Sequence, residues 1–309
     1  MRIARSLVLG VLVFAACNER GTPKRDPDGA LPDPDGAPEV HDAEESALDP
    51  FGIQKLYKTA PGGLVYYTKT NAASVTEFFD DGMVSNEVDA TLSKNPDGSW
   101  HISDTDTTWV IHQAHTNYEI TIECKILSAK QTGGNQNLVL YGNGEQHSTD
   151  PTRNWHGSAN KAWLMTDGEV NFQKELFHES QNRGYTSSVE EGNIGDVQGK
   201  WVRIKFVSYN KPNARVLEMW ADVTLTNTWT LAKAYLDDGD WPASNGFDAY
   251  MEDMRDQHPA HVPQLLRPGV EREITRNEIV NWEGELISFH SYSSAYDFRN
   301  ASVREIAAP

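Results

Sequence analysis

The stretch Trp201–Tyr209 (WVRIKFVSY) decides the fold class, because apolar and polar side chains alternate along most of it. Alternation with a period of two residues is typical of a β-strand that buries one face. The residues 210–213 (NKPN) are typical of a turn, and Val216–Val223 alternates in the same way. The two segments therefore predict a pair of neighbouring antiparallel strands.

The same alternation recurs through most of the chain after residue 50, with turn residues such as Gly133-Gly134 and Asp167-Gly168 between the segments. It predicts eight further strands. They span Trp109–Gln113, Tyr118–Leu127, Leu138–Tyr141, Lys161–Met165, Val170–His178, Thr228–Tyr235, Leu286–Tyr292 and Phe298–Ile306.

One stretch has a helical pattern. Apolar residues at 247, 250, 251 and 254 follow the spacing of one helix face, and Ser244-Asn245 can cap its first turn. Parallel α/β folds are excluded because crossover helices are missing. We expect an all-β protein, a β-sandwich or jelly roll of two antiparallel sheets with one short helix in a long loop. The 246–285 segment is either a lid over a cleft or a decoration.

Charge divides the 309 residues into three segments, which carry a net charge of −18 together. Residues 1–16 contain two bases and no acid, residues 17–50 have a net charge of −7, and residues 51–309 have −13 together with all nine tryptophans. This acidity excludes nucleic acid as a partner, because phosphate binding requires clustered Lys and Arg. An anionic polysaccharide in a locally basic cleft remains open.

The first segment has the pattern of a signal peptide. Arg2 and Arg5 precede the apolar run Leu7–Phe14, which is too short to span a bilayer. The following Ala15-Ala16-Cys17 resembles the lipobox of bacterial lipoproteins, which implies an acylated Cys17 at the mature N-terminus. An ordinary signal peptide with a chance cysteine is the alternative. The resemblance implies a lipid anchor as the membrane contact, in the outer membrane or at the surface of a Gram-negative cell.

Residues 17–50 follow as a tether, and residues 51–309 as the folded domain. The tether repeats Asp-Pro-Asp-Gly-Ala at 26–30 and 33–37, a composition that favours a disordered, extended spacer over a calcium site. Cys124 is then the one cysteine left and has no internal disulfide partner. It shares the parity of Ile120, Ile122 and Ile126, so we expect it in the core.

The order of three segments resembles the concanavalin A-like jelly rolls. They are Trp201–Val207, Val216–Asp222 and a closing Phe298–Ile306. This group includes laminarin-type glucanases, many polysaccharide lyases and sugar-binding modules. The resemblance covers roughly residues 100–309 and implies a carbohydrate function by analogy.

Strand parity selects candidate ligand-facing residues. In the strand from Val170, the even positions are mostly apolar, whereas Gln173 and Glu175 share the other face. Arg203 and Lys205 share one face of their strand. On the next strand Glu218, Trp220 and Asp222 share a face, and on the strand from Leu286 the residues Ser288, His290 and Tyr292 do so. The alternative for each residue is an ordinary solvent-exposed position. Our candidates for substrate binding are Glu175, Arg203, Lys205 and Trp220.

We expect a polysaccharide lyase that cleaves a uronic-acid polysaccharide by β-elimination. This reaction needs a base and a group that neutralises the sugar carboxylate. The candidate catalytic residues are Arg153, His156, Gln173, Lys174, His178, His290 and Tyr292, with Tyr185 as a further candidate. The Arg-x-Glu-Leu-Arg and Gln-Ile-His motifs of alginate-type lyases are missing from the sequence.

Two other functions remain open. A non-catalytic glycan-binding protein needs only a stacking platform such as Trp220 or Tyr292. A glycoside hydrolase needs paired carboxylates, for which Glu175 and Glu179 have the outer spacing of the laminarin-type motif without its central acid. No cofactor is required by any of these. The resemblance implies a structural Ca²⁺, with Asp297 as candidate ligand.

Overall fold

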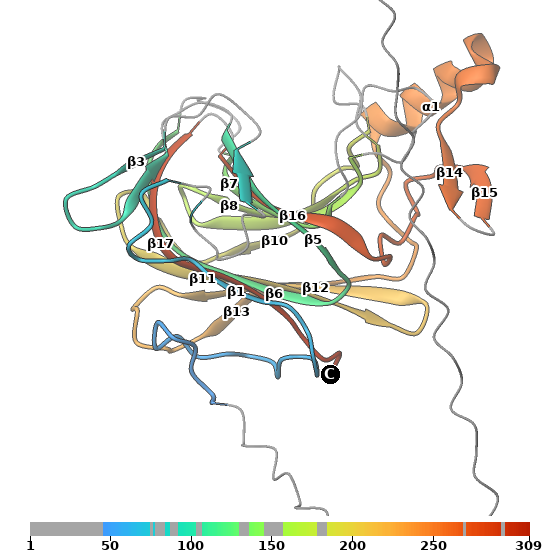
Figure 1. The fold of residues 1–309 in the computed structure, drawn as a ribbon. Coiled ribbons are helices and arrows are strands. Elements are labelled where there is room, and N and C mark those ends of the chain that lie inside the picture. Colours follow the sequence, from blue (N-terminus) through green and yellow to red (C-terminus); the bar gives the residue numbers. More distant parts are fainter. Residues whose placement is uncertain are drawn as a thin grey trace, which may run out of the picture. The chain divides into compact units, whose positions relative to one another are not determined.

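The predicted strands pair into two large antiparallel sheets that face each other across an apolar core (Figure 1). The computed structural model describes residues 46–74, 77, 84–86, 92–102, 107–129, 136–144, 157–177, 184–267, 270–291 and 294–309. The expectation of an all-β sandwich with one short helix is confirmed. The ten predicted strands all overlap strands of the structure.

Within these residues, one sheet has eight strands in the order β13-β12-β11-β6-β17-β4-β3, and β1 pairs with β17 outside this path. We call it the eight-stranded sheet. Its strands are β1 (Val65–Tyr67), β3 (Leu92–Lys94), β4 (Trp100–Ile102), β6 (Tyr118–Ala129), β11 (Val202–Lys211), β12 (Ala214–Asp222), β13 (Thr230–Asp237) and β17 (Ser294–Glu305). The closing strand β17 lies beside β6, in the centre of this sheet.

The other sheet has seven strands among the described residues, in the order β10-β9-β8-β7-β16-β5-β2. We call it the seven-stranded sheet. Its strands are β2 (Val84–Asn86), β5 (Thr107–His115), β7 (Gln136–Gly144), β8 (Ala159–Met165), β9 (Glu169–Glu175), β10 (Val189–Asn193) and β16 (Gly284–Ser291). The strands β7, β8, β9 and β10 follow one another in sequence as a meander of hairpins, whereas β16, β5 and β2 join the sheet from distant parts of the chain.

The core lies between the two sheets because every second residue of each strand points inward. Ile122 pairs with Ile204 in the eight-stranded sheet, and both are fully buried. Phe206 of this sheet meets Phe172 of the other, with ring centroids 6.2 Å apart. Cys124 is also fully buried in this cluster, which confirms its expected place in the core.

The segment between β13 and β16, residues 238–283, carries the helix and is called the α1 segment. It contains α1 (Asn245–Gln257), the short 3-10 helix η2 (Pro259–His261), and the hairpin of β14 (Gln264–Arg267) with β15 (Val270–Glu273). Ser244 caps α1 as predicted, accepting a hydrogen bond from the Phe247 backbone N–H. Figure 1 shows α1 and the hairpin together, to one side of the two layers.

The α1 segment has an apolar cluster of its own. Phe247 and Met251 of α1 pack with Val262, Ile274 and Phe177, the last of which follows β9. The segment is therefore fixed to the end of a strand of the seven-stranded sheet. Among the described residues, no helix has both the length and the apolar character needed to cross a bilayer.

Candidate functional site

A polar and aromatic row crosses the outer face of the seven-stranded sheet, the face turned away from the core. The register pairs Tyr141 with Lys161, and Lys161 with Gln173. Directly opposed residues lie on the same face of a sheet. Leu140 and Phe172, which neighbour two of these residues in the chain, are fully buried in the core. Tyr141, Lys161 and Gln173 therefore share the outer face.

A buried ion pair forms the centre of this row. The Nζ of Lys161 lies 2.7 Å from Oε2 of Glu175, and the two residues are 1% and 0% exposed. The same ammonium lies 4.5 Å from the ring centroid of Tyr141 and 3.7 Å from that of Tyr185. Burial lowers the pKa of Lys161, and the attraction of Glu175 only partly offsets this. Lys161 thus holds two tyrosine rings beside one buried charge pair.

Two further side chains border the tyrosines. The rings of Tyr141 and His290 meet edge to face, with centroids 5.7 Å apart. Gln173 donates a hydrogen bond from Nε2 to the carbonyl of Thr186 at 2.9 Å. Tyr141, Gln173, Tyr185 and His290 are all partly exposed. Aromatic faces beside amide and imidazole groups can pack against the C–H groups of a ligand and hydrogen-bond its hydroxyls.

The structure brings together four of the candidate residues, Gln173, Glu175, His290 and Tyr185, at this face. The other candidates fall into two groups. The predictions for Cys17, Arg153, His156, His178 and Tyr292 lie outside the described residues. Lys174, Arg203, Lys205 and Trp220 are described and lie elsewhere.

Lys174 faces away from the candidate site, which corrects its expected place in a ligand cleft. It is fully buried, with Nζ 3.0 Å from Oδ2 of Asp237 and 2.5 Å from the carbonyl of Glu278. The ammonium also lies 4.3 Å from the Trp241 ring centroid. Burial lowers the pKa of Lys174 to about 8, against the attraction of Asp237. This pair ties β9 to β13 and to the α1 segment.

Arg203, Lys205 and Trp220 belong to the eight-stranded sheet, so the core separates them from Gln173 and Glu175. One ligand cleft cannot contain both groups, and this corrects the expectation that they act together. The Nζ of Lys205 lies 2.7 Å from Oε1 of Glu119, and Lys205 is 1% exposed. Burial lowers the pKa of Lys205 despite the nearby Glu119.

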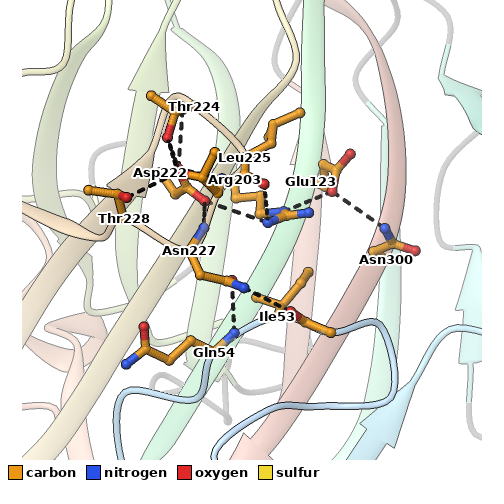
Figure 2. A network of polar contacts seen from close by, with 12 residues as sticks. Ile53, Gln54, Glu123, Arg203, Asp222, Thr224, Leu225, Asn227, Thr228 and Asn300 are labelled. Atoms are coloured by element: carbon orange, nitrogen blue, oxygen red, sulfur yellow. Dashed lines mark hydrogen bonds and ion pairs between the residues drawn. The ribbon is translucent and has the colours of Figure 1, made fainter.

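A network of polar contacts surrounds Arg203 (Figure 2). Its Nε donates to Glu123 at 2.9 Å, and its Nη1 lies 3.5 Å from Oδ2 of Asp222. Asp222 in turn accepts hydrogen bonds from the backbone N–H groups of Thr224, Thr226 and Asn227. Arg203 therefore stabilises the loop after β12 and has two carboxylate partners already.

The N-terminal part of the described chain lies over this same face. The backbone N–H groups of Leu56 and Tyr57 donate to Oε2 of Glu119 at 3.1 and 3.2 Å. Asn227 makes two hydrogen bonds with the backbone of this part of the chain (Figure 2). Its Nδ2 donates to the carbonyl of Gly52, and its Oδ1 accepts a hydrogen bond from the N–H of Gln54. The outer face of the eight-stranded sheet is thus covered in part by its own chain.

Trp220 is held at the border of this covered region. Its Nε1 donates to Glu218 at 2.8 Å, and the Tyr57 hydroxyl donates to the same carboxylate oxygen at 2.7 Å. Glu218, which accepts both hydrogen bonds, is 8% exposed. They fix the tryptophan to the N-terminal segment of the domain.

Asp297, the candidate calcium ligand, is an ion-pairing residue in the structure. Its Oδ2 lies 2.8 Å from Nζ of Lys125, and its Oδ1 contacts His101 Nδ1 at 2.9 Å and Asn95 Nδ2 at 3.1 Å. Calcium is bound by several oxygen ligands. No group of three or more His, Cys, Asp or Glu residues that could hold a metal occurs among the described residues. These neighbours do not fit a calcium site, which corrects the expectation for Asp297.

Tyr141 was not selected as a site residue from the sequence, and Lys161 was given no specific role in the site. Both lie in predicted strands, where Leu140 and Ala162 mark the buried parity. The parity of these two strands therefore contains the signal. What parity alone does not reveal is that β7, β8 and β9 lie side by side.

The described strands form a sandwich of two antiparallel sheets. No protein-family model and no curated protein sequence matches the chain. Three solved structures are similar to it in fold. A carbohydrate-binding module, CBM66 from Bacillus subtilis, shares 12% identity over 72% of this chain and 96% of its own, with a TM-score of 0.39.

A Bacillus subtilis protein of unknown function with a galectin-like fold shares 11% identity over 82% of this chain and all of its own, with a TM-score of 0.45. The exoplasmic/lumenal domain of VIP36, in a Ca²⁺- and Man3GlcNAc-bound form, shares 8% identity over 74% of this chain and 86% of its own, with a TM-score of 0.39. At this identity, the similarity concerns the fold alone.

Proposed function

We propose that the protein binds a glycan on the outer face of the seven-stranded sheet. The observation that carries this proposal is the pair of partly exposed rings of Tyr141 and Tyr185, each of which contacts the buried Lys161 ammonium. A ring fixed in this way loses little further entropy when a sugar packs against it. Gln173 and His290 lie beside the rings and supply polar groups for sugar hydroxyls.

The other sheet offers a weaker platform. Lys205 and Glu119 are buried there beneath the N-terminal segment, and Trp220 is fixed by Glu218. A glycan could reach their polar groups only after displacing hydrogen bonds that already exist. This comparison favours the seven-stranded sheet.

Affinity electrophoresis tests the proposal. The protein is run through native gels that contain a series of neutral and anionic polysaccharides. We expect at least one of them to retard it, and Tyr141→Ala to reduce the retardation. Trp220→Phe is the control on the other sheet and should migrate like the unmodified protein. A protein that no polysaccharide retards would contradict glycan binding.

A lyase that acts on an anionic polysaccharide is the second candidate function. The observation that favours it is the contact of the Tyr141 and His290 rings on the same sheet face as an amide, Gln173, which lies two strands from Tyr141. Phenol and imidazole groups can act as base or acid in β-elimination, and an amide can hydrogen-bond the sugar carboxylate. Lys161 does not serve as the neutralising group in this arrangement, because Glu175 already pairs with it.

Product analysis separates the enzymatic functions from binding. A lyase releases unsaturated uronides, which absorb in the ultraviolet, from alginate, glucuronan, pectate or a glycosaminoglycan. A hydrolase releases reducing ends without unsaturation. A glycan that is bound and stays intact supports the non-catalytic function.

We also propose that Cys17 carries a lipid that anchors the protein in the cell envelope, with residues 17–50 as spacer. The order of basic residues, apolar run and Ala15-Ala16-Cys17 supports this. Labelling of cells with a radioactive fatty acid tests it. The unmodified protein should incorporate label and enter the detergent phase, whereas Cys17→Ser should do neither. An unlabelled wild-type protein would contradict the proposal.

A further inference from the structure

A cavity of about 520 Å³ lies in the α1 segment, between one face of α1 and residues 274–277. Its volume is within the range of sites that bind small molecules, about 300–1,000 Å³. None of the residues that line it belongs to the seven-stranded sheet. The cavity is therefore a separate feature from the candidate glycan face.

The floor of the cavity is apolar and firmly packed. Phe247, Met251 and Ile274 line it and are each 1% exposed. Phe247 contacts Phe177 with ring centroids 5.8 Å apart, which connects the floor to the end of β9. The Ser244 cap fixes the first turn of α1 directly beside it. Such a floor keeps its shape without a ligand.

Two guanidinium groups border the cavity, and each is oriented by a carboxylate. Arg276 donates from Nη1 to both oxygens of Asp248 at 3.0 and 3.1 Å, and from Nε to the carbonyl of Trp241 at 3.1 Å. Arg255 donates from Nε to Glu273 at 2.6 Å. A guanidinium has five N–H donors, so both groups keep donors beyond these bonds.

The charges around the cavity balance. The ionisable residues of its lining are Asp248, Glu252, Arg255 and Arg276, two acids and two bases. A phosphate or a uronate would gain little from a lining of zero net charge. Oriented donors, carboxylate acceptors and an apolar floor together suit a neutral ligand with many hydroxyl groups.

We infer that this cavity binds a neutral sugar unit. It is a second carbohydrate site, beyond the glycan face proposed for the seven-stranded sheet. A glycan that occupied both sites would be held by the domain and by the α1 segment at once, which raises its apparent affinity.

Methionine methyl groups report on the two sites separately. Met251 lies in the cavity floor, Met165 packs with Tyr141 on the outer face of the seven-stranded sheet, and Met219 lies in the core between the sheets. The full chain is labelled with [methyl-¹³C]methionine, and each resonance is assigned by a Met→Leu variant. Spectra are recorded with neutral hexasaccharides (cello-, xylo-, manno- and laminarihexaose) and with hexagalacturonate, up to about 10 mM to reach weak affinities.

Two arginine variants make a matched pair. Arg255→Gln removes a guanidinium of the cavity lining, and the Arg255 side chain is 49% exposed. Arg272→Gln removes a guanidinium of the same segment that is 53% exposed and also bound to a glutamate, Glu278, but that does not line the cavity. Arg255→Gln should fold, because both partners of its ion pair are partly exposed. Arg272→Gln keeps an amide that can still donate a hydrogen bond to the buried Glu278, and circular dichroism checks that this variant is folded.

We expect at least one neutral hexasaccharide to move the Met251 resonance in a saturable way, while Met219 stays unchanged. Arg255→Gln should weaken this response about tenfold through the loss of a charge-assisted hydrogen bond, and Arg272→Gln should leave it unchanged. The inference fails if Met251 moves with no neutral sugar, if it responds more strongly to hexagalacturonate, or if both variants behave alike. A response of Met165 alone overturns this inference and supports binding at the seven-stranded sheet. A response of Met251 alone supports the cavity site and contradicts binding at the seven-stranded sheet.

Discussion

Lys161 and Glu175 form an ion pair of 2.7 Å beside the rings of Tyr141 and Tyr185 on the outer face of the seven-stranded sheet. Neither side chain reaches solvent to more than 2%. An ion pair at this depth contributes little net stability, because the desolvation of both charges offsets their attraction. Its consequence here is positional, since the ammonium lies against the rings of both Tyr141 and Tyr185.

This pair predicts a non-additive effect on stability. Lys161→Met leaves the Glu175 carboxylate buried without its counterion and should lower the free energy of unfolding by about 3–5 kcal/mol. The double variant Lys161→Met/Glu175→Leu removes both charges and should be more stable than either single variant. Denaturant unfolding of the four proteins measures the coupling. Additive losses would show that the two charges do not interact.

Glu119 predicts a loss of stability in acid. Burial alone would raise its pKa, but Lys205 and Arg304 outweigh this effect and hold the pKa below the ordinary value of 4.5. A carboxyl group with a lowered folded-state pKa contributes stability above the unfolded-state value and loses it as the pH falls through the folded-state value. The unfolding free energy should therefore fall below pH 4.5, and the fall should be smaller in Glu119→Gln.

The N-terminal segment should loosen in the same pH range. Glu119 accepts hydrogen bonds from the backbone of Leu56 and Tyr57, and these weaken when the carboxylate is protonated. Limited proteolysis with pepsin measures this loosening. At pH 5, where Glu119 of the unmodified protein is ionised, we expect cleavage near Tyr57 to be faster in Glu119→Gln than in the unmodified protein. Equal cleavage rates would show that Glu119 does not hold the segment.

Lys174 predicts a gain of stability at alkaline pH. Its pKa is about 8 in the folded protein because of burial, against 10.5 for an ordinary lysine. Between these values the unfolded chain binds more protons, so this group makes the free energy of unfolding rise with pH, by at most about 3 kcal/mol. The double variant Lys174→Met/Asp237→Leu should lack this rise. Urea unfolding at pH 8 and pH 10 tests the difference.

Two glycines predict contrasting effects of an added methyl group. A Cβ on Gly142 would lie 2.0 Å from Cζ of Tyr118, a fully buried ring, so Gly142→Ala should destabilise the fold strongly. A Cβ on Gly246 in α1 would meet no atom within 4 Å. Gly246→Ala should therefore raise stability by up to about 1 kcal/mol through helix propensity. Thermal unfolding of both variants provides the comparison, and equal shifts would contradict it.

The fold was predictable because strand parity and caps are local signals. The alternation in Trp201–Tyr209 and the Ser244 cap each depend on residues close in sequence, and both predictions agree with the structure. The site was less predictable. Lys174 and Lys205 share polar character with Gln173, but their places depend on which strands are neighbours and on which carboxylate each lysine meets.

Buried lysines explain most of the differences between the predicted and the observed site. A charged residue in a strand suggests a solvent-exposed position, yet Lys161, Lys174 and Lys205 each find a carboxylate from another strand and are 1% exposed or less. The segment that covers the eight-stranded sheet, around Leu56, lacks a strand pattern altogether. Its place is set by Glu119, which is more than sixty residues away in sequence.

The central claim is that the outer face of the seven-stranded sheet binds the glycan. Titration calorimetry tests it most directly, with a polysaccharide that retards the protein in native gels and with three proteins: the unmodified chain, Tyr185→Ala and Trp220→Ala. We predict binding about tenfold weaker for Tyr185→Ala, from the loss of one stacked ring, and unchanged binding for Trp220→Ala. Unchanged binding by Tyr185→Ala together with weakened binding by Trp220→Ala would contradict the account.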